Sequence, residues 1–424
     1  MILESPPALS ALPKRSLGSR ALGWARGRVD GRVRDAFWAL RTRRDLSVAS
    51  LALRSATRLG FAPASDRAHL HATVRWLEAA HDAGGGGGVA AFYDARTGAW
   101  GPPYPETTGY IIPTILEYGQ LRQEPRFRRR ALRMADWLLT TQLASGAFPI
   151  GPLWPEWERR AIVFDTGQII DGLTAAYTAS DAAAYLEAAV RAGRWLERIQ
   201  ATDGSWKSFT PLDRANSYDV RAAWALLRLS SVANEAGFRS TAVRHARWVL
   251  QQQEPDGWFR LASFERDRPP LTHTIAYTIE GLLGCGLDLG DDAFVRAAFR
   301  AADALRRRQE QDGFLRAYFA QGWTSDATWS CLPGTAQMAL VWLRKAEVAG
   351  DDADRHAAER ALRSVKRGQP RKGRVGMAGG VAGSFPVYAA YEPYRLLNWG
   401  AKFFADALLL KGSKGAGLDA RQES

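Results

Sequence analysis

The chain lacks the cysteines that would staple a small secreted fold or build a thiolate metal site. Only Cys285 and Cys331 occur in 424 residues, and no close spacing links them. Their scarcity excludes a disulfide scaffold and a cysteine-rich metal centre, and it suits a reducing compartment. The histidines offer no metal motif either, because His69 and His71 would face different ways on a helix. We therefore predict no metal and no cofactor.

Long apolar runs are also missing. No stretch of 18 or more apolar residues occurs, which excludes a membrane-spanning helix. No apolar segment of the kind found in secretory signals follows the first charged residues. We predict a cytoplasmic protein, and peripheral attachment to the inner membrane stays open because of the charge distribution described next.

Acidic residues are scarce near the N-terminus. The net charge is +13, and residues 1–60 contain 12 Lys and Arg against 4 Asp and Glu. Within this basic extension, residues 32–41 could form an amphipathic helix with a basic face. Such a segment is expected to bind an anionic membrane surface or an acidic partner, and the alternative is an arm packed on the outside of the fold. Nucleic acid is not expected, because no recognition motif accompanies the charge.

The most regular feature of the chain is a repeat. Four segments end a helix with Gln, turn at a glycine and continue with an aromatic residue. The turn glycines are 58, 53 and 56 residues apart, at Gly146, Gly204, Gly257 and Gly313. A fixed period of this size is typical of stacked supersecondary units, and two helices with their turns fill it. The repeat therefore predicts a series of helical hairpins.

Two kinds of helix alternate along the chain. Charged, amphipathic helices are predicted at 66–80, 124–142, 181–200, 237–253, 291–309 and 352–366. Helices that are apolar nearly all round are predicted at 107–119, 164–177, 218–229, 272–286, 331–347 and 394–410. A helix that is apolar on every side is buried on every side. We predict an all-α, single (α/α)6 barrel over residues 61–411, with the extension at 1–60 and a flexible tail at 412–424.

The long connections run from outer to inner helices, so they should gather over the N-termini of the inner helices. Long loops in a compact domain are usually functional. Candidate catalytic residues at these helix starts are Glu106, Asp165, Asp219 and His273. Facing carboxyl groups are what glycosidic chemistry needs. The alternatives are that the two aspartates cap their helices and that the histidine is a core residue.

Aromatic and polar side chains near the same helix starts could bind a sugar. Tyr and Trp stack on sugar faces, and Arg pairs with carboxylates. The Trp residues could equally pack in the core or at the rim. The candidates for substrate binding are Tyr104, Tyr110, Gln168, Tyr218, Arg221, Trp258, Tyr277, Trp323, Trp329, Tyr391, Glu392, Tyr394, Arg395 and Asn398.

These hairpins with carboxylate-bearing loops resemble the six-hairpin (α/α)6 glycosidase-like superfamily. That superfamily includes unsaturated glucuronyl hydrolases, polysaccharide lyases and the C-terminal domain of glucuronyl C5-epimerases. The segments YPETTGYIIPT (104–114), FDTGQ (164–168), THTIAY (272–277) and NWGAKFF (398–404) look like a poorly characterised bacterial group associated with exopolysaccharide or capsule biosynthesis. The resemblance covers about residues 65–410. No catalytic motif of the hydrolases maps onto the chain, which puts simple hydrolysis in doubt.

The Gln-turn-aromatic segments also resemble the QW repeats of squalene and terpene cyclases. The Asp-x-Asp-Asp acid motif of those enzymes is absent from the sequence.

The sequence therefore predicts a carbohydrate-active protein that acts on an acidic bacterial polysaccharide or its precursor. The reaction would be that of a glycoside hydrolase, a polysaccharide lyase or a uronate epimerase. Two alternatives stay open: a non-catalytic glycan-binding component of an exopolysaccharide synthesis complex, and a terpenoid or prenyl cyclase-like enzyme. The last predicts an apolar, aromatic cavity without a central acid pair.

Overall fold

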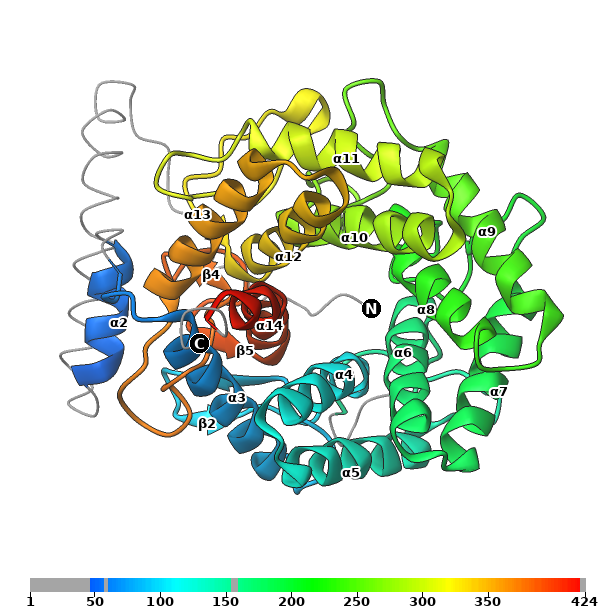
Figure 1. Ribbon diagram of the computed structural model, residues 1–424, viewed down its shortest axis with the longest axis horizontal. Helices are drawn as coiled ribbons and strands as arrows, with labels where there is room; N and C mark the ends of the chain where they lie inside the picture. Colours follow the sequence, from blue (N-terminus) through cyan, green and yellow to red (C-terminus); the bar gives the residue numbers. More distant parts are fainter. Residues whose placement is uncertain (1–45, 57–59, 154–158, 420–424) are drawn as a thin grey trace, which may run out of the picture.

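The computed structural model describes residues 46–56, 60–153 and 159–419. Two concentric rings of helices form a barrel (Figure 1). The inner ring consists of α4 (Pro105–Arg122), α6 (Val163–Ser180), α8 (Val220–Ser230), α10 (Thr272–Leu289), α12 (Leu332–Ala349) and α14 (Asn398–Asp419). The outer ring consists of α3 (Asp66–Ala83), α5 (Pro125–Thr141), α7 (Ala183–Ile199), α9 (Ala236–Leu250), α11 (Asp292–Arg306) and α13 (Asp352–Gly368). The predicted all-α (α/α)6 barrel is confirmed.

Side-chain polarity decides which ring a helix joins. On α7, Tyr185, Ala189 and Leu196 are buried at helical spacing, while Glu187 and Arg191 face solvent. On α10, every residue from Thr272 to Gly286 is buried. Amphipathic helices therefore form the outer ring, and helices buried on all sides form the inner ring.

The repeated glutamines join neighbouring outer helices. The Gln142 amide nitrogen, just after α5, donates to the carbonyl oxygens of Gly146 and Ala188 at 2.8 Å each. Arg191 of α7 donates to the same side chain's oxygen at 2.7 Å. We call this arrangement a glutamine clamp. It recurs at Gln200 and Gln253, and Gln309 makes the two contacts with the next outer helix, to the Ala357 carbonyl and from Arg360. The clamp explains why the sequence repeats with each hairpin.

The ring closes where the last inner helix meets the first outer helix. α14, the last helix, packs against α3, the first helix of the outer ring. Gln369, just after α13, takes the place of a clamp glutamine. Its amide nitrogen donates to Thr73 at 2.8 Å, and its oxygen lies 2.5 Å from Nδ1 of His69. In the closed ring, the first and the last hairpin therefore pack against each other.

Short strands cross the loops over the inner-helix N-termini. β1 (Phe92–Asp94) pairs antiparallel with β2 (Ala99–Trp100) and with β5 (Arg395–Leu397), and β3 (Ser330–Cys331) pairs with β4 (Ser384–Phe385). Two predicted inner-helix starts are corrected. The last helix begins at residue 398, not 394, because β5 pairs with β1. α8 begins at residue 220, not 218, because a 3-10 turn precedes it, η2 (Ser217–Asp219).

The predicted terminal segments reach partly into the described residues. α2 (Leu46–Ala56) lies outside the ring (Figure 1), and its Val48, Leu51 and Ala52 belong to the hydrophobic core. This part of the predicted extension is therefore packed on the barrel, whereas the amphipathic segment 32–41 lies outside the described residues. Residues 412–419 of the predicted C-terminal tail continue α14 as helix. Within the described residues, no helix combines the length and apolar character needed to cross a bilayer.

Candidate active site

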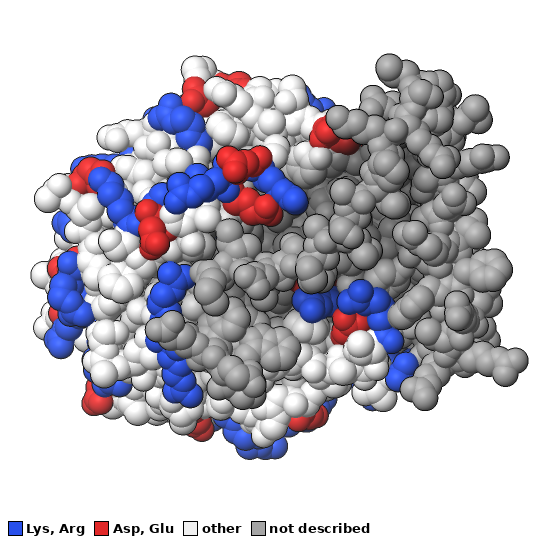
Figure 2. All heavy atoms as spheres, turned by 180° about the vertical axis from the view of Figure 1, so that it is seen from behind, with Lys and Arg blue, Asp and Glu red and all other residues white. Residues whose placement is uncertain are grey.

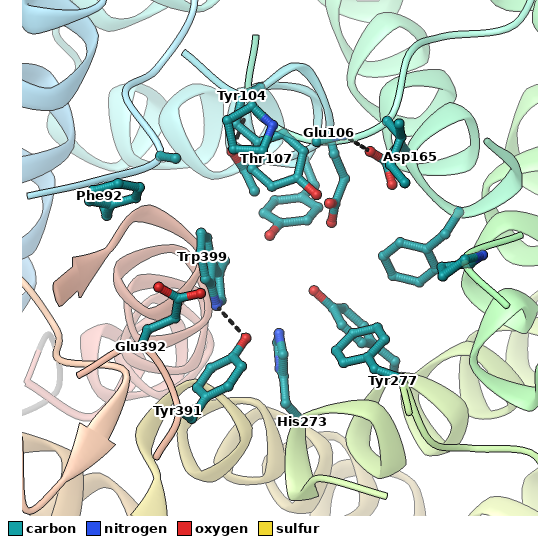
Figure 3. Close-up of a pocket in the computed structure, with 18 of the residues that line it drawn as sticks. Phe92, Tyr104, Glu106, Thr107, Asp165, His273, Tyr277, Tyr391, Glu392 and Trp399 are labelled. Carbon is teal, nitrogen blue, oxygen red and sulfur yellow. Dashed lines mark hydrogen bonds between the residues drawn. The ribbon is translucent and has the colours of Figure 1, made fainter. Parts of the chain in front are cut away.

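A cavity of 310 Å³ opens among the N-terminal ends of the inner helices. Figure 3 shows its labelled side chains arranged around an open centre. The lining comes from five inner helices or the segments just before them, and from the loops between the rings. Its residues are Ala91, Phe92, Tyr104, Glu106, Thr107, Tyr110, Ile150, Gly151, Pro152, Phe164, Asp165, Pro211, Tyr218, Phe264, His273, Tyr277, Tyr391, Glu392, Arg395 and Trp399.

Two carboxyl groups share one side of the cavity. Glu106 is the second residue of α4 and Asp165 is the third residue of α6, and their side chains are buried. Tyr104, just before α4, lies beside both carboxyl groups, and its hydroxyl favours the ionised form of each. The backbone N–H of Gly151 donates to Asp165 Oδ2 at 2.9 Å. Asp165 is therefore bonded to a loop and does not cap α6, whose N-cap position is Ile162.

Burial favours the protonated, uncharged form of both acids. It raises the pKa of Asp165 to about 7, although the hydrogen bond from Gly151 acts in the opposite direction. Burial, and then the charge of Asp165, raise the pKa of Glu106 well above its usual range. Adjacent carboxyl groups that cannot both ionise easily are suited to giving and taking a proton at neutral pH.

His273 lies on the opposite side of the cavity from the two acids (Figure 3). It is the second residue of α10, and its ring centroid is 4.3 Å from that of Tyr277. Burial lowers the pKa of His273 to about 3, so the imidazole is neutral at physiological pH. A neutral imidazole has one nitrogen free to accept a proton, although the lowered pKa makes His273 a weak base in the ligand-free site.

Aromatic rings form most of the remaining wall. Phe164 makes edge contacts with Tyr218 and Tyr277, with centroids 5.6 Å and 4.8 Å apart. On the other side, Trp399 donates through Nε1 to the Tyr391 hydroxyl at 3.2 Å. Fixed rings of this kind offer flat surfaces for the apolar faces of a sugar.

Seven of the predicted binding residues line the cavity: Tyr104, Tyr110, Tyr218, Tyr277, Tyr391, Glu392 and Arg395. The charge of Arg395 is already compensated. Its Nη1 lies 2.6 Å from Glu392 Oε2, its Nε lies 3.8 Å from Asp94, and its guanidinium covers the Phe92 ring at 4.0 Å. The predicted arginine therefore contributes a paired charge to the cavity.

Four polar candidates lie away from the cavity lining. Asp219 is fully buried beside Asn216, whose Nδ2 is 3.5 Å from it, and burial raises its pKa well above the usual range. Gln168 and Arg221 are hydrogen-bonded to each other inside the inner ring. Asn398 donates to the Ala90 carbonyl and to Thr107, which ties the start of α14 to the β1 loop.

Four aromatic candidates also lie outside the cavity. Trp258 and Trp323 donate to the carbonyl oxygens of Phe319 and Asp256, and so hold loops together. Tyr394 lies beneath the Arg96 guanidinium at 5.6 Å. Trp329 lines a neighbouring hollow of 330 Å³ that shares Phe264 and Tyr391 with the cavity.

The sequence prediction missed several lining residues. Phe92 and Trp399 stand beside predicted candidates, but nothing in their spacing marks them. Phe264 and the segment 150–152 lie in long loops, whose conformation has no periodic signal. Among the described residues, no group of three or more His, Cys, Asp and Glu could hold a metal ion.

Comparison with known proteins agrees with the fold. The family model of the squalene-hopene cyclase C-terminal domain matches residues 100–283, which is less than half of the chain. No curated protein sequence matches the chain. Among solved structures, an unsaturated glucuronyl hydrolase from Bacillus sp. GL1 is similar with a TM-score of 0.65 and 17% identity, covering 81% of this chain and 96% of its own.

Two further solved structures differ in their activities. Cellobiose 2-epimerase from Bacillus thermoamylovorans has a TM-score of 0.64 and 11% identity, over 80% of this chain and 98% of its own. A D-mannose isomerase has a TM-score of 0.64 and 12% identity, over 83% of this chain and 100% of its own. At such identities the likeness shows the fold alone. The predicted resemblance to the six-hairpin glycosidase-like fold is confirmed.

Proposed function

We propose that this chain is a carbohydrate-active enzyme that moves a proton at a sugar carbon next to a carbonyl or carboxyl group. The observation that carries the proposal is the pairing of opposite roles across one cavity. Glu106 and Asp165 can donate a proton on one side, and His273 can accept one on the other (Figure 3). The fold neighbours, which include a hydrolase, an epimerase and an isomerase of sugars, agree with this class.

The proposed reaction has two outcomes. The imidazole takes the proton from the carbon, and the electron pair of that C–H bond moves onto the adjacent carbonyl or carboxyl group. If the acid pair returns a proton to the same carbon from the opposite face, the result is epimerisation. If the electron pair instead expels the oxygen substituent on the next carbon, and the acid pair protonates that oxygen, the result is β-elimination.

The cavity wall supports a sugar as the substrate. Aromatic rings suit a sugar face, and a cavity of 310 Å³ lies at the small end of ligand pockets, which suits one or two sugar units. A uronic acid in an acidic bacterial polysaccharide is one candidate. Its carboxyl group would meet the protonated acids and the Tyr104 hydroxyl, since Arg395 is already paired. A neutral sugar with a carbonyl group is the other.

Exchange with heavy water tests the proposal. The full chain is incubated in D2O with uronic-acid glycans and with neutral disaccharides, and products are followed by mass spectrometry and ultraviolet absorbance. Deuterium at a sugar carbon supports epimerisation, and a new unsaturated chromophore supports elimination. New reducing ends without label would make the protein a hydrolase and contradict the proposal. Glycan binding without any turnover would favour the non-catalytic alternative.

Asp165→Asn tests the role of the acid pair. We expect turnover to fall about 10²–10⁴-fold because a general acid is lost. Asp171→Asn is the matched control, since Asp171 lies on the same helix but pairs with Arg228 outside the cavity lining. Equal loss in both variants would indicate damage to α6 and not to the chemistry.

A second candidate is acid-initiated cyclisation of an isoprenoid. The aromatic lining favours it, because ring faces can shelter a carbocation. The pair of acids, Glu106 and Asp165, counts against it, because this alternative predicts a cavity without a central acid pair. The match to the cyclase family model also spans Glu106, Asp165 and His273. The presence of a neutral base facing the acids favours the sugar reaction. Incubation with polyprenyl substrates and detection of cyclic products would decide for cyclisation.

A further inference from the structure

A chain of buried polar side chains crosses the inside of the inner ring and ends at the cavity. Arg221 of α8 donates to Glu280 Oε1 of α10 at 2.8 Å and to Gln168 Oε1 of α6 at 3.1 Å. Gln337 of α12 donates through Nε2 to Glu280 Oε2 at 2.5 Å, and its Oε1 lies 3.1 Å from His273 Nδ1. Hydrogen bonds therefore connect four inner helices to the imidazole that faces the cavity.

The ion pair in this chain decides how the Gln337 amide is oriented. Arg221 is always protonated and only donates, so it compensates the Glu280 carboxylate in the interior, where both are buried. A carboxylate only accepts hydrogen bonds. If the amide were turned round, its oxygen would meet Glu280 Oε2 at 2.5 Å with no proton between the two acceptors. The amide nitrogen must therefore face Glu280, and the amide oxygen must face His273.

The orientation of the amide decides which nitrogen of His273 carries the proton. The Gln337 oxygen accepts a hydrogen bond, so Nδ1 must be the protonated nitrogen. In a neutral imidazole the other nitrogen, Nε2, then has a free lone pair. Figure 3 shows the ring extending from α10 toward the open centre of the cavity.

We infer that Arg221, Glu280 and Gln337 are positioning residues that hold His273 as the Nδ1–H tautomer, so that Nε2 is the proton acceptor of the site. The inference deepens the proposed function and rests on it for the reaction itself. In that reaction Nε2 takes the proton from the sugar carbon, the C–H electron pair moves onto the adjacent carbonyl or carboxyl group, and the acid pair acts from the opposite side.

The other groups that face His273 keep the ring neutral. Burial raises the pKa of Tyr277 and of Tyr391, whose ring centroids lie 4.3 Å and 6.5 Å from the imidazole, so both hydroxyls stay protonated. Burial, and then the positive charges of Arg221 and Lys402, lower the pKa of His273, so the ring is neutral in the ligand-free site and the charge that develops on the substrate must offset them when Nε2 takes a proton. The tautomer is therefore the property that Gln337 controls.

Nitrogen NMR of the ligand-free full chain tests the tautomer directly. The protein is labelled with 15N-histidine, and the His273 signals are assigned by their loss in His273→Gln. At pH 7 we expect a protonated Nδ1 and an unprotonated Nε2 in long-range 1H–15N correlation spectra. A protonated Nε2, in the neutral or the charged ring, would overturn the inference.

Two variants separate positioning from general stability. Gln337→Met keeps the side-chain size and leaves the Arg221–Glu280 ion pair intact, and we expect His273 to become a mixture of tautomers. Gln168→Met is the matched control, because it removes a contact of Arg221 at the far end of the chain and should leave the Nδ1–H tautomer unchanged. A pure Nδ1–H tautomer in Gln337→Met would contradict the inference, even if activity fell.

The test distinguishes this inference from the proposed function. The NMR readout needs no substrate, so a wrong tautomer would leave the sugar chemistry open, and a correct tautomer without turnover on any sugar would contradict only the proposed function. On a sugar that reacts, Gln337→Met should lower kcat on the order of 10²-fold with KM nearly unchanged. A change in KM alone would assign Gln337 to substrate binding instead.

Discussion

Asp165 and Glu106 show how burial raises the pKa of carboxyl groups that would be ionised at neutral pH in the unfolded chain. Each stands within the first turn of an inner helix, where free N–H groups would normally favour the ionised form. Burial outweighs this effect, and the pKa of both carboxyl groups is raised. The protein thus holds protons at neutral pH that the unfolded chain would release.

This proton uptake makes stability depend on pH. The pKa of Asp165 is about 7 in the folded chain against an ordinary 3.8, so between these values the folded state holds more protons. The free energy of unfolding should therefore fall as pH rises from about 4 to 7. Asp165→Asn should reduce this slope and stabilise the protein at pH 7 by at most about 4 kcal/mol. Denaturant unfolding at several pH values measures it.

Asp171→Asn is again the control. It breaks the 2.5 Å contact with Arg228 and keeps the Asp165 carboxyl, so its unfolding free energy should keep the wild-type slope. If Asp165→Asn also keeps the full slope, Asp165 is ionised in the folded protein and its assigned role as a proton donor is wrong.

Helix position predicted some site residues and not others. Glu106, Asp165 and His273 stand one or two residues inside their helices, and their side chains reach the cavity. Asp219 and Arg221 stand at a comparable place on α8, but a preceding 3-10 turn and a rotation of about 100° per residue point them elsewhere. The position of a residue within its helix predicts the end of the barrel at which it lies. The direction in which its side chain points depends on how the helix is rotated about its axis, which packing decides.

At the scale of elements, the turn glycines connect one hairpin to the next. Gly146, Gly204, Gly257 and Gly313 have φ between 88° and 93°, a conformation that glycine adopts without strain. Each passes close to the backbone of the next outer helix. An added Cβ at Gly313 would lie 1.9 Å from the Arg360 carbonyl oxygen. Glycine therefore recurs in each repeat because the turn needs both a positive φ and a close approach to the backbone of the next outer helix.

Gly313→Ala tests this close approach. We expect a loss of roughly 2–4 kcal/mol in the free energy of unfolding, since strain at positive φ adds to a steric clash with α13. Gly322→Ala is the control, because Gly322 has φ of 73° but open space around its Cβ position. The control should lose only about 1 kcal/mol. Equal losses in thermal or urea unfolding would mean that φ alone explains the glycine.

Helices and strands differed in how well the sequence predicted them. All twelve barrel helices have a periodic or continuous apolar pattern over 11 or more residues, and eleven of them agree with the prediction within three residues at each end, whereas α14 starts four residues later and ends nine residues later than predicted. The strands were not predicted. β1 and β5 have three residues each and pair across some 300 positions, as Tyr93 does with Leu396. Such short segments carry no period, so only the closed fold brings them together.

At the scale of the whole molecule, the charge of the described surface is mixed. Figure 2 shows Lys and Arg interspersed with Asp and Glu over the described part of one face. Many charged side chains of the described residues form ion pairs, such as Arg126 with Glu78 and Arg194 with Glu235. Of the net charge of +13, +8 lies in residues 1–60, which hold 12 basic and 4 acidic residues, and +5 lies in the rest of the chain. A local excess of this kind attracts anionic surfaces.

Charge reversal in the extension tests whether it binds membranes. In the full chain, Arg32→Glu, Arg34→Glu and Arg41→Glu together should weaken binding to vesicles that contain anionic lipid. Basic residues near such a surface contribute about 1 kcal/mol each, so the combined loss should exceed 10²-fold. Wild-type binding should also fall as salt rises. Sedimentation with vesicles of phosphatidylglycerol and phosphatidylcholine measures both effects.

The control variant carries the same charge change on the barrel. Arg67, Arg75 and Arg129 are exposed on α3 and α5, and their joint replacement by Glu lowers the net charge equally. If the extension is the binding segment, this control should keep most of the affinity. Equal losses of vesicle binding in the two variants would mean that binding depends only on the total charge of the protein. Unchanged binding in the extension variant would assign the extension to packing on the barrel, as α2 already does through Val48 and Leu51.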